Sequence, residues 1–178
     1  MPLIQGGTGP SARNALARRL GDSDLPPDVV VLCRNGKEGH FDATMFGGKT
    51  GRTHAEIDAK VKYLYTFDAG DPTTLAKWTK AELGAAHELF VKLKEHLQQG
   101  DSVVVTCVAG QNRSCMFTHA LDERFAQPKC EALRKVAKRL GDREAVLALA
   151  PLGPERAKRG REEDAPGAAI TPGSHAGN

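Results

Sequence analysis

One stretch of the sequence combines a nucleophile with groups that bind anions. Residues 103–114 read VVVTCVAGQNRS, an apolar run that ends in Cys107, followed by five further residues, Arg113 and Ser114. A cysteine reacts as its thiolate, and nearby positive charge lowers the thiol pKa from its ordinary value of about 8.5. The planar guanidinium of arginine can donate two parallel hydrogen bonds to phosphate oxygens. The spacing therefore indicates a nucleophile and an anion-binding group in one short segment.

The residues between Cys107 and Arg113 are suited to surrounding an anion, and we expect all of them to contribute to phosphate binding: Val108, Ala109, Gly110, Gln111 and Asn112. A loop of small residues can turn its backbone N–H groups inward, and glycine permits backbone angles that other residues avoid. Residues 114–125 are compatible with a helix, whose N-terminus adds partial positive charge. These features favour a phosphate ester as ligand over the alternative of a buried strand cysteine beside a surface arginine.

The segment resembles the signature loop of the cysteine-dependent protein tyrosine phosphatases, and most closely that of the dual-specificity phosphatases. In that family the pattern is usually His-Cys-x-x-Gly-x-x-Arg followed by Ser or Thr. The resemblance covers about residues 28–140 and is weak outside the loop. It implies that Cys107 attacks phosphorus to form a cysteinyl-phosphate and that Arg113 stabilises the phosphoryl oxygens. It also implies that Ser114 helps the sulfur to leave when water hydrolyses the intermediate.

The mechanism that the resemblance implies also needs a general acid to protonate the leaving oxygen. The family supplies an aspartate from a loop that follows the strand upstream of the helix before the signature. That loop is residues 67–72 here, FDAGDP. Asp71 is the first choice, because its distance from Cys107 is closer to the family habit and Pro72 would stiffen the loop. Asp68 is the second choice, and the alternative is that both are solvated loop carboxylates.

Two departures from the family pattern leave the substrate class open. Thr106 stands where the family usually has a histidine that helps to tune the cysteine. Asn112 precedes the arginine, and a Gly-x-Asn-Arg ending resembles the RNA 5′-phosphatase branch of the superfamily. That branch usually has His-Gly where this chain has Ala109 and Gly110. No stretch resembles the aromatic loop that deepens the pocket of the larger tyrosine-specific members, which favours a shallow site.

The resemblance therefore implies a dual-specificity phosphatase that acts on phosphorylated proteins without a metal or cofactor. One alternative is an RNA 5′-phosphatase that acts on RNA 5′ ends. Another is a module that binds phosphorylated partners without turnover. A third is a nucleotide-binding protein, because residues 43–50, ATMFGGKT, fit a relaxed Gly-x4-Gly-Lys-Thr pattern that ends in Lys49 and Thr50. Gly51 interrupts the helix that such a site needs, so a basic loop is the favoured interpretation.

The elements around the segment predict an α/β fold with a central, mostly parallel sheet and helices on both faces. Apolar and β-branched runs predict strands at residues 28–33, 61–67 and 101–106. Capping-box spacing predicts helices that begin near Thr53 and Thr79, the second with Ala86, Leu89 and Leu93 at helical spacing. A short basic helical stretch is also predicted at residues 12–20. Helices are also expected at residues 130–140 and 142–150.

Composition and charge indicate one ordinary globular domain. The 178 residues are 40% hydrophobic and carry a net charge of +3, which suits anionic substrates but is too small for a nucleic-acid-binding signature. We expect a peripheral N-terminal arm at residues 1–27, a catalytic domain at 28–150 and a disordered tail at 151–178. Neither a secretion signal nor a membrane span is predicted. A cytoplasmic protein is expected, with the nucleus as an alternative because of a small basic cluster at residues 156–161.

The other cysteines and the six histidines show no metal-ligand spacing, so no metal site is predicted. The default for Cys33 is a buried core cysteine, and the alternative is an oxidised pair with Cys107. Cys115 is expected to pack inside the helix that follows the loop.

Overall fold

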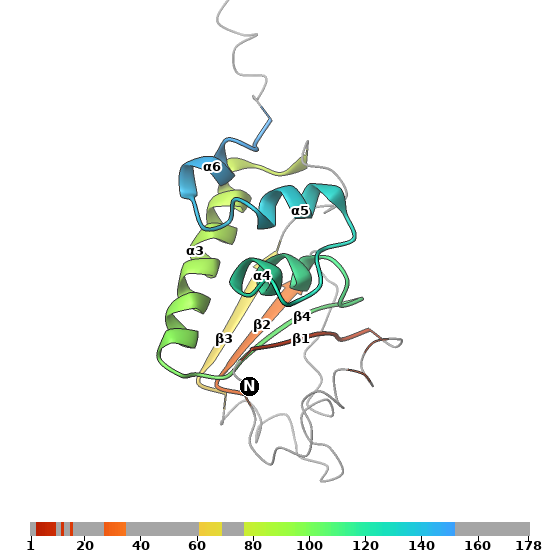
Figure 1. Ribbon diagram of the computed structural model, residues 1–178, viewed down its shortest axis with the longest axis vertical. Helices are drawn as coiled ribbons and strands as arrows, with labels where there is room; N and C mark the ends of the chain where they lie inside the picture. The colour runs from red at the N-terminus through yellow and green to blue at the C-terminus, as the bar shows by residue number, and fades with distance from the viewer. Residues whose placement is uncertain are drawn as a thin grey trace, which may run out of the picture.

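The computed structural model describes residues 3–9, 12, 15, 27–34, 61–68 and 77–151. Its strands are β1 (Leu3–Gly7), β2 (Val29–Arg34), β3 (Tyr63–Asp68) and β4 (Val103–Cys107). Its helices are α3 (Lys80–Gln98), α4 (Arg113–Leu121), α5 (Glu131–Ala137) and α6 (Arg143–Leu147). Figure 1 shows the helices stacked beside a small sheet. The predicted α/β fold is confirmed.

The sheet has four strands in the order β1-β4-β2-β3, and every neighbouring pair is parallel. β4 and β2 are central, and their valine-rich sequences are buried, as is typical of strands inside a parallel sheet. Because the strands are parallel, their carboxyl ends lie along one edge. Gly7, Cys107 and Asp68 therefore end their strands on the same side of the molecule. In open parallel sheets, ligands bind at this side.

The interpretation of residues 1–27 as a peripheral arm is wrong for β1. Leu3 to Gly7 pair in register with Val103 to Cys107, so the domain includes a strand that precedes position 28. The short run Leu-Ile-Gln-Gly-Gly carries a weak strand signal, because two glycines follow only two apolar residues. Backbone hydrogen bonds to β4 stabilise this strand although its residues have a low intrinsic strand propensity.

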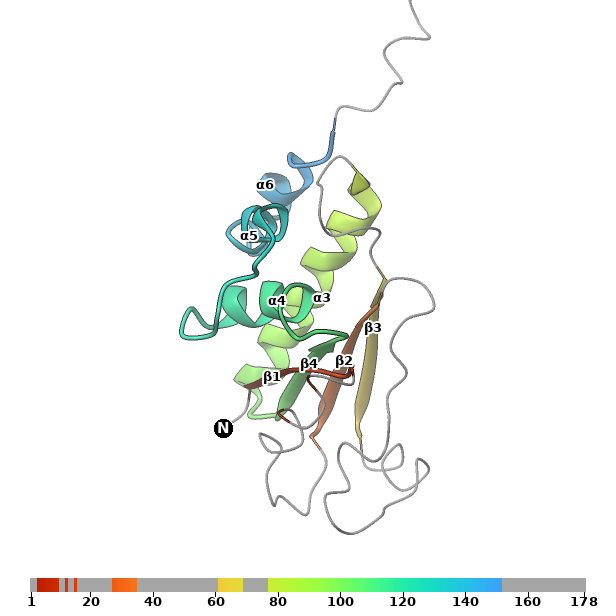
Figure 2. The ribbon, with the colours of Figure 1, turned by 90° about the vertical axis from the view of Figure 1, so that its right-hand side faces the viewer.

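All the described helices lie on one face of the sheet, as Figure 2 shows edge-on, and the predicted helices on the other face stay a prediction. Side chains of β2 and β4 that point to this face, such as Val31 and Val105, join the core with Phe117 of α4 and Leu93 of α3. The stretches predicted to form helices at residues 12–20 and from Thr53 onward lie almost wholly outside the described residues. The predicted tail lies outside them beyond position 151.

Helix α3 follows its sequence signals closely. Thr79 and Glu82 form the predicted capping box, in which the Thr79 side chain accepts from the Glu82 N–H and the Glu82 carboxylate accepts from the Thr79 N–H. Ala86, Leu89 and Leu93 are buried as the spacing predicts. None of the described helices is long and apolar enough to cross a membrane.

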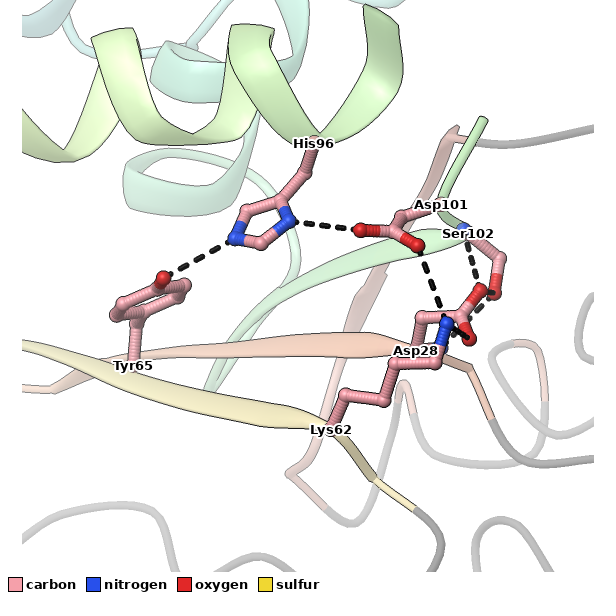
Figure 3. A network of polar contacts seen from close by, with 6 residues as sticks. All are labelled: Asp28, Lys62, Tyr65, His96, Asp101 and Ser102. Atoms are coloured by element: carbon pink, nitrogen blue, oxygen red, sulfur yellow. Dashed lines mark hydrogen bonds and ion pairs between the residues drawn. The ribbon is translucent and has the colours of Figure 1, made fainter. Parts of the chain in front are cut away.

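A polar network joins β2, β3, β4 and α3 at the amino ends of the strands (Figure 3). Cys107 ends β4 at the opposite edge of the sheet. Asp28 accepts hydrogen bonds of 2.9 Å from the backbone N–H and the hydroxyl of Ser102. Lys62 lies 2.9 Å from the Asp28 carboxylate and 3.3 Å from that of Asp101. The six residues of the network are Asp28, Lys62, Tyr65, His96, Asp101 and Ser102.

His96 is the buried member of this network. Its Nδ1 lies 2.8 Å from Asp101 Oδ2, and its Nε2 lies 3.1 Å from the hydroxyl of Tyr65. The imidazole also packs against the ring of Tyr63, with centroids 4.5 Å apart. These contacts give His96 a packing role at the amino ends of the strands.

Candidate active site

The candidate site lies where β4 ends and α4 begins. All five residues of β4 are buried, and the strand ends at Cys107. Residues 108–112 connect it to α4, whose first residue is Arg113. The N-terminus of α4 therefore points at the end of the central strand, and helix N-termini attract anions. The chain brings Cys107, Arg113 and Ser114 together as the sequence predicts.

The sulfur of Cys107 is surrounded by hydrogen-bond donors. Its Sγ lies 3.2 Å from Ser114 Oγ. Burial raises the pKa of the Cys107 thiol, and hydrogen bonds from the Ser114 hydroxyl and from the backbone N–H groups of Ser114, Asn112 and Gly110 lower it. The net result is a pKa below the ordinary cysteine value. The geometry thus stabilises a thiolate inside a largely buried site.

Arg113 is 9% exposed, so its side chain is held against the protein. The guanidinium lies close enough to Cys33 to lower the pKa of that thiol. An arginine at the first position of a helix that begins beside a thiolate can bind the oxygens of a phosphoryl group that the thiolate attacks.

Gly110 shapes the turn of the loop, because its φ of +65° lies in the left-handed region. A Cβ at this position would lie 2.7 Å from the backbone nitrogen of Gly7. A Cβ on Gly7 would in turn lie 2.8 Å from the backbone nitrogen of Gly110. The two glycines let the end of β1 pack directly against the loop.

Further backbone hydrogen bonds extend this contact beyond β1. Thr8 N–H donates to the carbonyl of Cys107 at 2.9 Å, and Gly9 N–H donates to that of Val108 at 2.8 Å. The segment that follows β1 therefore continues along the start of the loop and supports it from that side.

The connection between α4 and α5 holds the loop from another side. Lys129 N–H donates to the carbonyl of Gln111 at 3.1 Å, and Cys130 N–H donates to Asn112 Oδ1 at 2.8 Å. The Asn112 side chain thus fastens the loop to this connection, whereas its backbone N–H faces the Cys107 sulfur. A cavity of about 360 Å³ lies between the two supports and is bordered by Gln5, Ala109, Gln111 and Lys129 among others.

Asp68 is the one predicted general acid within the described residues. It is exposed at the end of β3, paired in register with Arg34 of β2. It lies near enough to raise the pKa of Cys33, so it belongs to the same end of the sheet as the loop. Asp71 lies outside the described residues, and the choice between the two aspartates stays a prediction.

Thr106 does not approach the Cys107 sulfur, because successive side chains of a strand point to opposite faces. Its hydroxyl donates to the carbonyl of Val31 at 3.0 Å and ties β4 to β2. The residue that departs from the family pattern therefore stabilises the sheet here. The donors around the sulfur come instead from the loop and from Ser114.

Cys33 and Cys115 are both buried, as predicted. Cys33 lies one position beyond the paired Leu32 and Thr106, which places it beside Cys107 on the neighbouring strand. Burial, followed by the nearby Cys107, raises the pKa of Cys33 well above its ordinary value. Cys115 lies inside α4, and its Sγ donates to the carbonyl of Gly110 at 3.5 Å.

Sequence reasoning missed Gln5, a buried amide on β1 that reaches the loop. Its Nε2 donates to the Gly110 carbonyl and to Ser114 Oγ. The available signal was a glutamine between apolar residues and a Gly-Gly pair, which becomes informative only once β1 is known to be a strand beside β4.

Solved structures similar to this chain include those of PTPMT1 and Tk-PTP. PTPMT1 matches with a TM-score of 0.44 and 18% identity over 88% of this chain and 94% of its own. Tk-PTP in its active form matches with a TM-score of 0.38 and 14% identity over 77% of this chain and 82% of its own. No protein-family model and no curated protein matches the chain. The likeness is loose, so the assignment of the site rests on its own geometry.

The competing motif at residues 43–50, with Lys49, lies outside the described residues. Within the part of the chain that the structure describes, no group of three or more His, Cys, Asp or Glu side chains is placed to hold a metal ion.

Proposed function

We propose that this protein hydrolyses phosphate monoesters through a covalent cysteinyl-phosphate. The observation that carries the proposal is the environment of the Cys107 sulfur. It receives hydrogen bonds from three backbone N–H groups and from Ser114, in front of the helix that Arg113 begins. A buried thiol whose pKa is lowered by donors that converge on it is suited to nucleophilic attack at neutral pH.

In the first step the Cys107 thiolate attacks phosphorus, an S–P bond forms and the P–O bond to the leaving group breaks. Arg113 binds the phosphoryl oxygens, on which the negative charge resides. The leaving oxygen takes a proton from an aspartic acid, for which Asp71 is the first candidate and Asp68 the second. Pre-organised hydrogen-bond donors such as the backbone N–H groups of this loop usually supply the largest part of transition-state stabilisation.

In the second step water attacks phosphorus and the S–P bond breaks. The aspartate now accepts a proton from the water, and the sulfur leaves as a thiolate. Ser114 Oγ, 3.2 Å from Cys107 Sγ, is placed to donate a hydrogen bond to the departing sulfur. Phosphate is released and the nucleophile is regenerated.

The favoured substrates are phosphorylated proteins, with phosphotyrosine and phosphoserine or phosphothreonine both accepted. The resemblance of the loop to dual-specificity phosphatases supports this choice. The second candidate, an RNA 5′-phosphatase, is favoured by Asn112 immediately before Arg113. A module that binds phosphate groups without turnover is the remaining outcome.

The first experiment measures hydrolysis of para-nitrophenyl phosphate in EDTA and a reducing agent, from mildly acidic to neutral pH. Wild type is compared with Cys107→Ser and with Cys130→Ser, a matched control at the half-exposed cysteine outside the loop. We expect wild type and Cys130→Ser to be equally active and Cys107→Ser to be inactive. Equal activity in Cys107→Ser would remove this residue from the chemistry, and loss of activity in EDTA would indicate a metal-dependent reaction.

Substrate class is then decided by measuring released phosphate. The panel holds a phosphotyrosine peptide, a phosphothreonine peptide and an RNA with a 5′-triphosphate. Turnover of both peptides supports the dual-specificity assignment, and turnover of the RNA alone supports the alternative. If nothing is hydrolysed but vanadate binds wild type, the chain is a binding module.

A further inference from the structure

Gln5 lies in the middle of β1 and points to the helical face of the sheet. It pairs in register with Val105, two positions before the nucleophile, and it is only 7% exposed. A buried amide needs hydrogen-bond partners, because leaving its groups unsatisfied is costly. Two acceptors of its nitrogen, the Gly110 carbonyl and Ser114 Oγ, belong to the candidate site.

The orientation of this amide follows from its partners. The Gly110 carbonyl can only accept a hydrogen bond, so the atom of Gln5 that contacts it is Nε2. The same nitrogen lies 3.3 Å from Ser114 Oγ. Since Nε2 carries two hydrogens, one amide serves both acceptors.

This orientation determines the role of the Ser114 hydroxyl. Its oxygen lies between Gln5 Nε2 at 3.3 Å and Cys107 Sγ at 3.2 Å. A hydroxyl has one hydrogen to donate and two lone pairs to accept with. When Gln5 donates to the oxygen, the hydroxyl hydrogen is left to point at the sulfur, and a thiolate can only accept.

We propose that Gln5 is a positioning residue that holds the Ser114 hydroxyl as a hydrogen-bond donor to the Cys107 sulfur. The part of this inference that concerns turnover rests on the proposed function. The part that concerns the thiolate does not, because a thiol can be titrated without any substrate.

Gln5 also restrains the loop itself. Its bond to the Gly110 carbonyl fixes the orientation of the peptide between Gly110 and Gln111. Because that peptide is planar and trans, its N–H points away from Gln5 when its carbonyl points toward it. One side chain thus contacts both the Ser114 hydroxyl and a backbone carbonyl of the loop.

Among the described residues, the titratable groups that interact with Cys33 on β2 are Cys107, Asp68 on β3 and Arg113 on α4, and none of them lies on β1. A neutral substitution of Gln5 leaves all three in place. A change in the titration of Cys107 in such a variant therefore reports the lost hydrogen bonds.

The test measures the rate of iodoacetamide alkylation of Cys107 against pH, read by mass spectrometry of the peptide that holds it. Gln5→Met keeps the length of the side chain and removes both donors. We expect its titration midpoint to rise by roughly half a unit to one unit, the equivalent of one hydrogen bond to a charged acceptor. Ile4→Val, on the opposite face of β1, is the matched control and should leave the midpoint unchanged.

Gln5→Glu supplies a second variant of nearly the same shape. Its carboxylate accepts the Ser114 hydrogen and turns it away from the sulfur, so its midpoint should rise at least as far as that of Gln5→Met. Circular dichroism establishes that each variant is folded before it is titrated. If folded Gln5→Met and Gln5→Glu both keep the wild-type midpoint, the proposal is overturned.

A double-mutant cycle distinguishes a role through Ser114 from a general disturbance of the loop. In a Ser114→Ala background Gln5→Met should produce less than half of the shift that it produces in wild type. A shift of equal size in both backgrounds would mean that Gln5 does not act through the hydroxyl, and the proposal would fail.

Turnover of para-nitrophenyl phosphate separates this inference from the proposed function. If wild type hydrolyses the ester, Gln5→Met should lower kcat more than it changes KM, since Ser114 assists the departing sulfur. If the Gln5 variants show the expected alkylation shifts but the wild type hydrolyses nothing, the proposed function is refuted and the role of Gln5 stands.

Discussion

At the scale of single residues, Cys107 is subject to two opposing influences. Burial disfavours its thiolate, and four hydrogen-bond donors favour it, with the donors prevailing. Among the described donors, Ser114 is the one that donates to the sulfur through its side chain as well as through its backbone N–H. Its hydroxyl can be removed by substitution without disturbing the backbone groups, so its contribution can be measured separately.

Ser114→Ala should slow breakdown of the cysteinyl-phosphate more than its formation. The hydroxyl lies 3.2 Å from the sulfur that must leave. Loss of one charge-assisted hydrogen bond lowers the rate of the second step by roughly tenfold to a hundredfold. Rapid-quench measurement of the phosphoenzyme should show a burst followed by slow turnover, and the Cys107 alkylation midpoint should move to higher pH. Turnover without accumulation of intermediate would contradict this role.

The general acid can be identified from how the loss of kcat on its substitution depends on the leaving group of the substrate. Asp71→Asn should lower kcat on phenyl phosphate by roughly a hundredfold or more, because phenoxide leaves poorly without a proton. The loss on para-nitrophenyl phosphate should be much smaller. Asp68→Asn is the matched comparison and should show little leaving-group dependence. The reverse pattern would assign the role to Asp68.

At the scale of elements, the loop is held between β1 and the connection from α4 to α5. β1 contributes the glycine contact at Gly7 and the amide of Gln5, and the connection contributes the N–H groups of Lys129 and Cys130. The loop thus has support from strand and connection on separate sides, which favours a pre-organised anion site.

Substitution of two glycines with positive φ can test whether β1 supports the loop. Gly110 has φ +65° and packs on Gly7, whereas Gly100 has φ +86° and a Cβ added there would meet no atom within 4 Å. Gly100→Ala should cost roughly 1–2 kcal/mol of unfolding free energy from backbone strain and leave activity intact. Gly110→Ala should cost more and abolish hydrolysis. Urea unfolding and kcat measure the two effects, and full activity in Gly110→Ala would show that β1 does not constrain the loop.

At the scale of the whole molecule, the two ends of the sheet differ in function: one carries the candidate site and the other stabilises the fold. The carboxyl ends of the strands carry the candidate site, and the amino ends are joined by the polar network of Figure 3. In that network the Ser102 N–H, the Lys62 ammonium and the Ser102 hydroxyl hold the pKa of Asp28 at about 2, below its ordinary value of 3.8. The Asp28 carboxylate therefore binds a proton less readily in the folded chain than in the unfolded chain.

This difference in the Asp28 pKa between the folded and unfolded chain predicts how the unfolding free energy depends on pH. The Asp28 carboxylate stabilises the fold fully above its ordinary pKa of 3.8, and its contribution declines as the pH falls toward about 2. Asp28→Asn should lower the unfolding free energy at neutral pH and flatten its decline in acid, while activity is retained because the site lies at the other end. Chemical denaturation from pH 7 into this acidic range measures both. An unchanged acid dependence would show that Asp28 contributes nothing to it.

The central strands, helix α3 with its capping box and the grouping of Cys107, Arg113 and Ser114 could be predicted from the sequence. These are local properties, because hydrophobic periodicity, capping and a short loop depend on residues close together in the chain. The folded structure was needed to show that residues 3–7 form a strand and that Gln5 reaches Ser114, 109 positions away. It also shows that Thr106 bonds to the backbone of β2 and that the Asn112 side chain fastens the loop to Cys130. Such contacts arise from strand order and register. These cannot be predicted from the local sequence of either segment, because they depend on how segments far apart in the chain pack together.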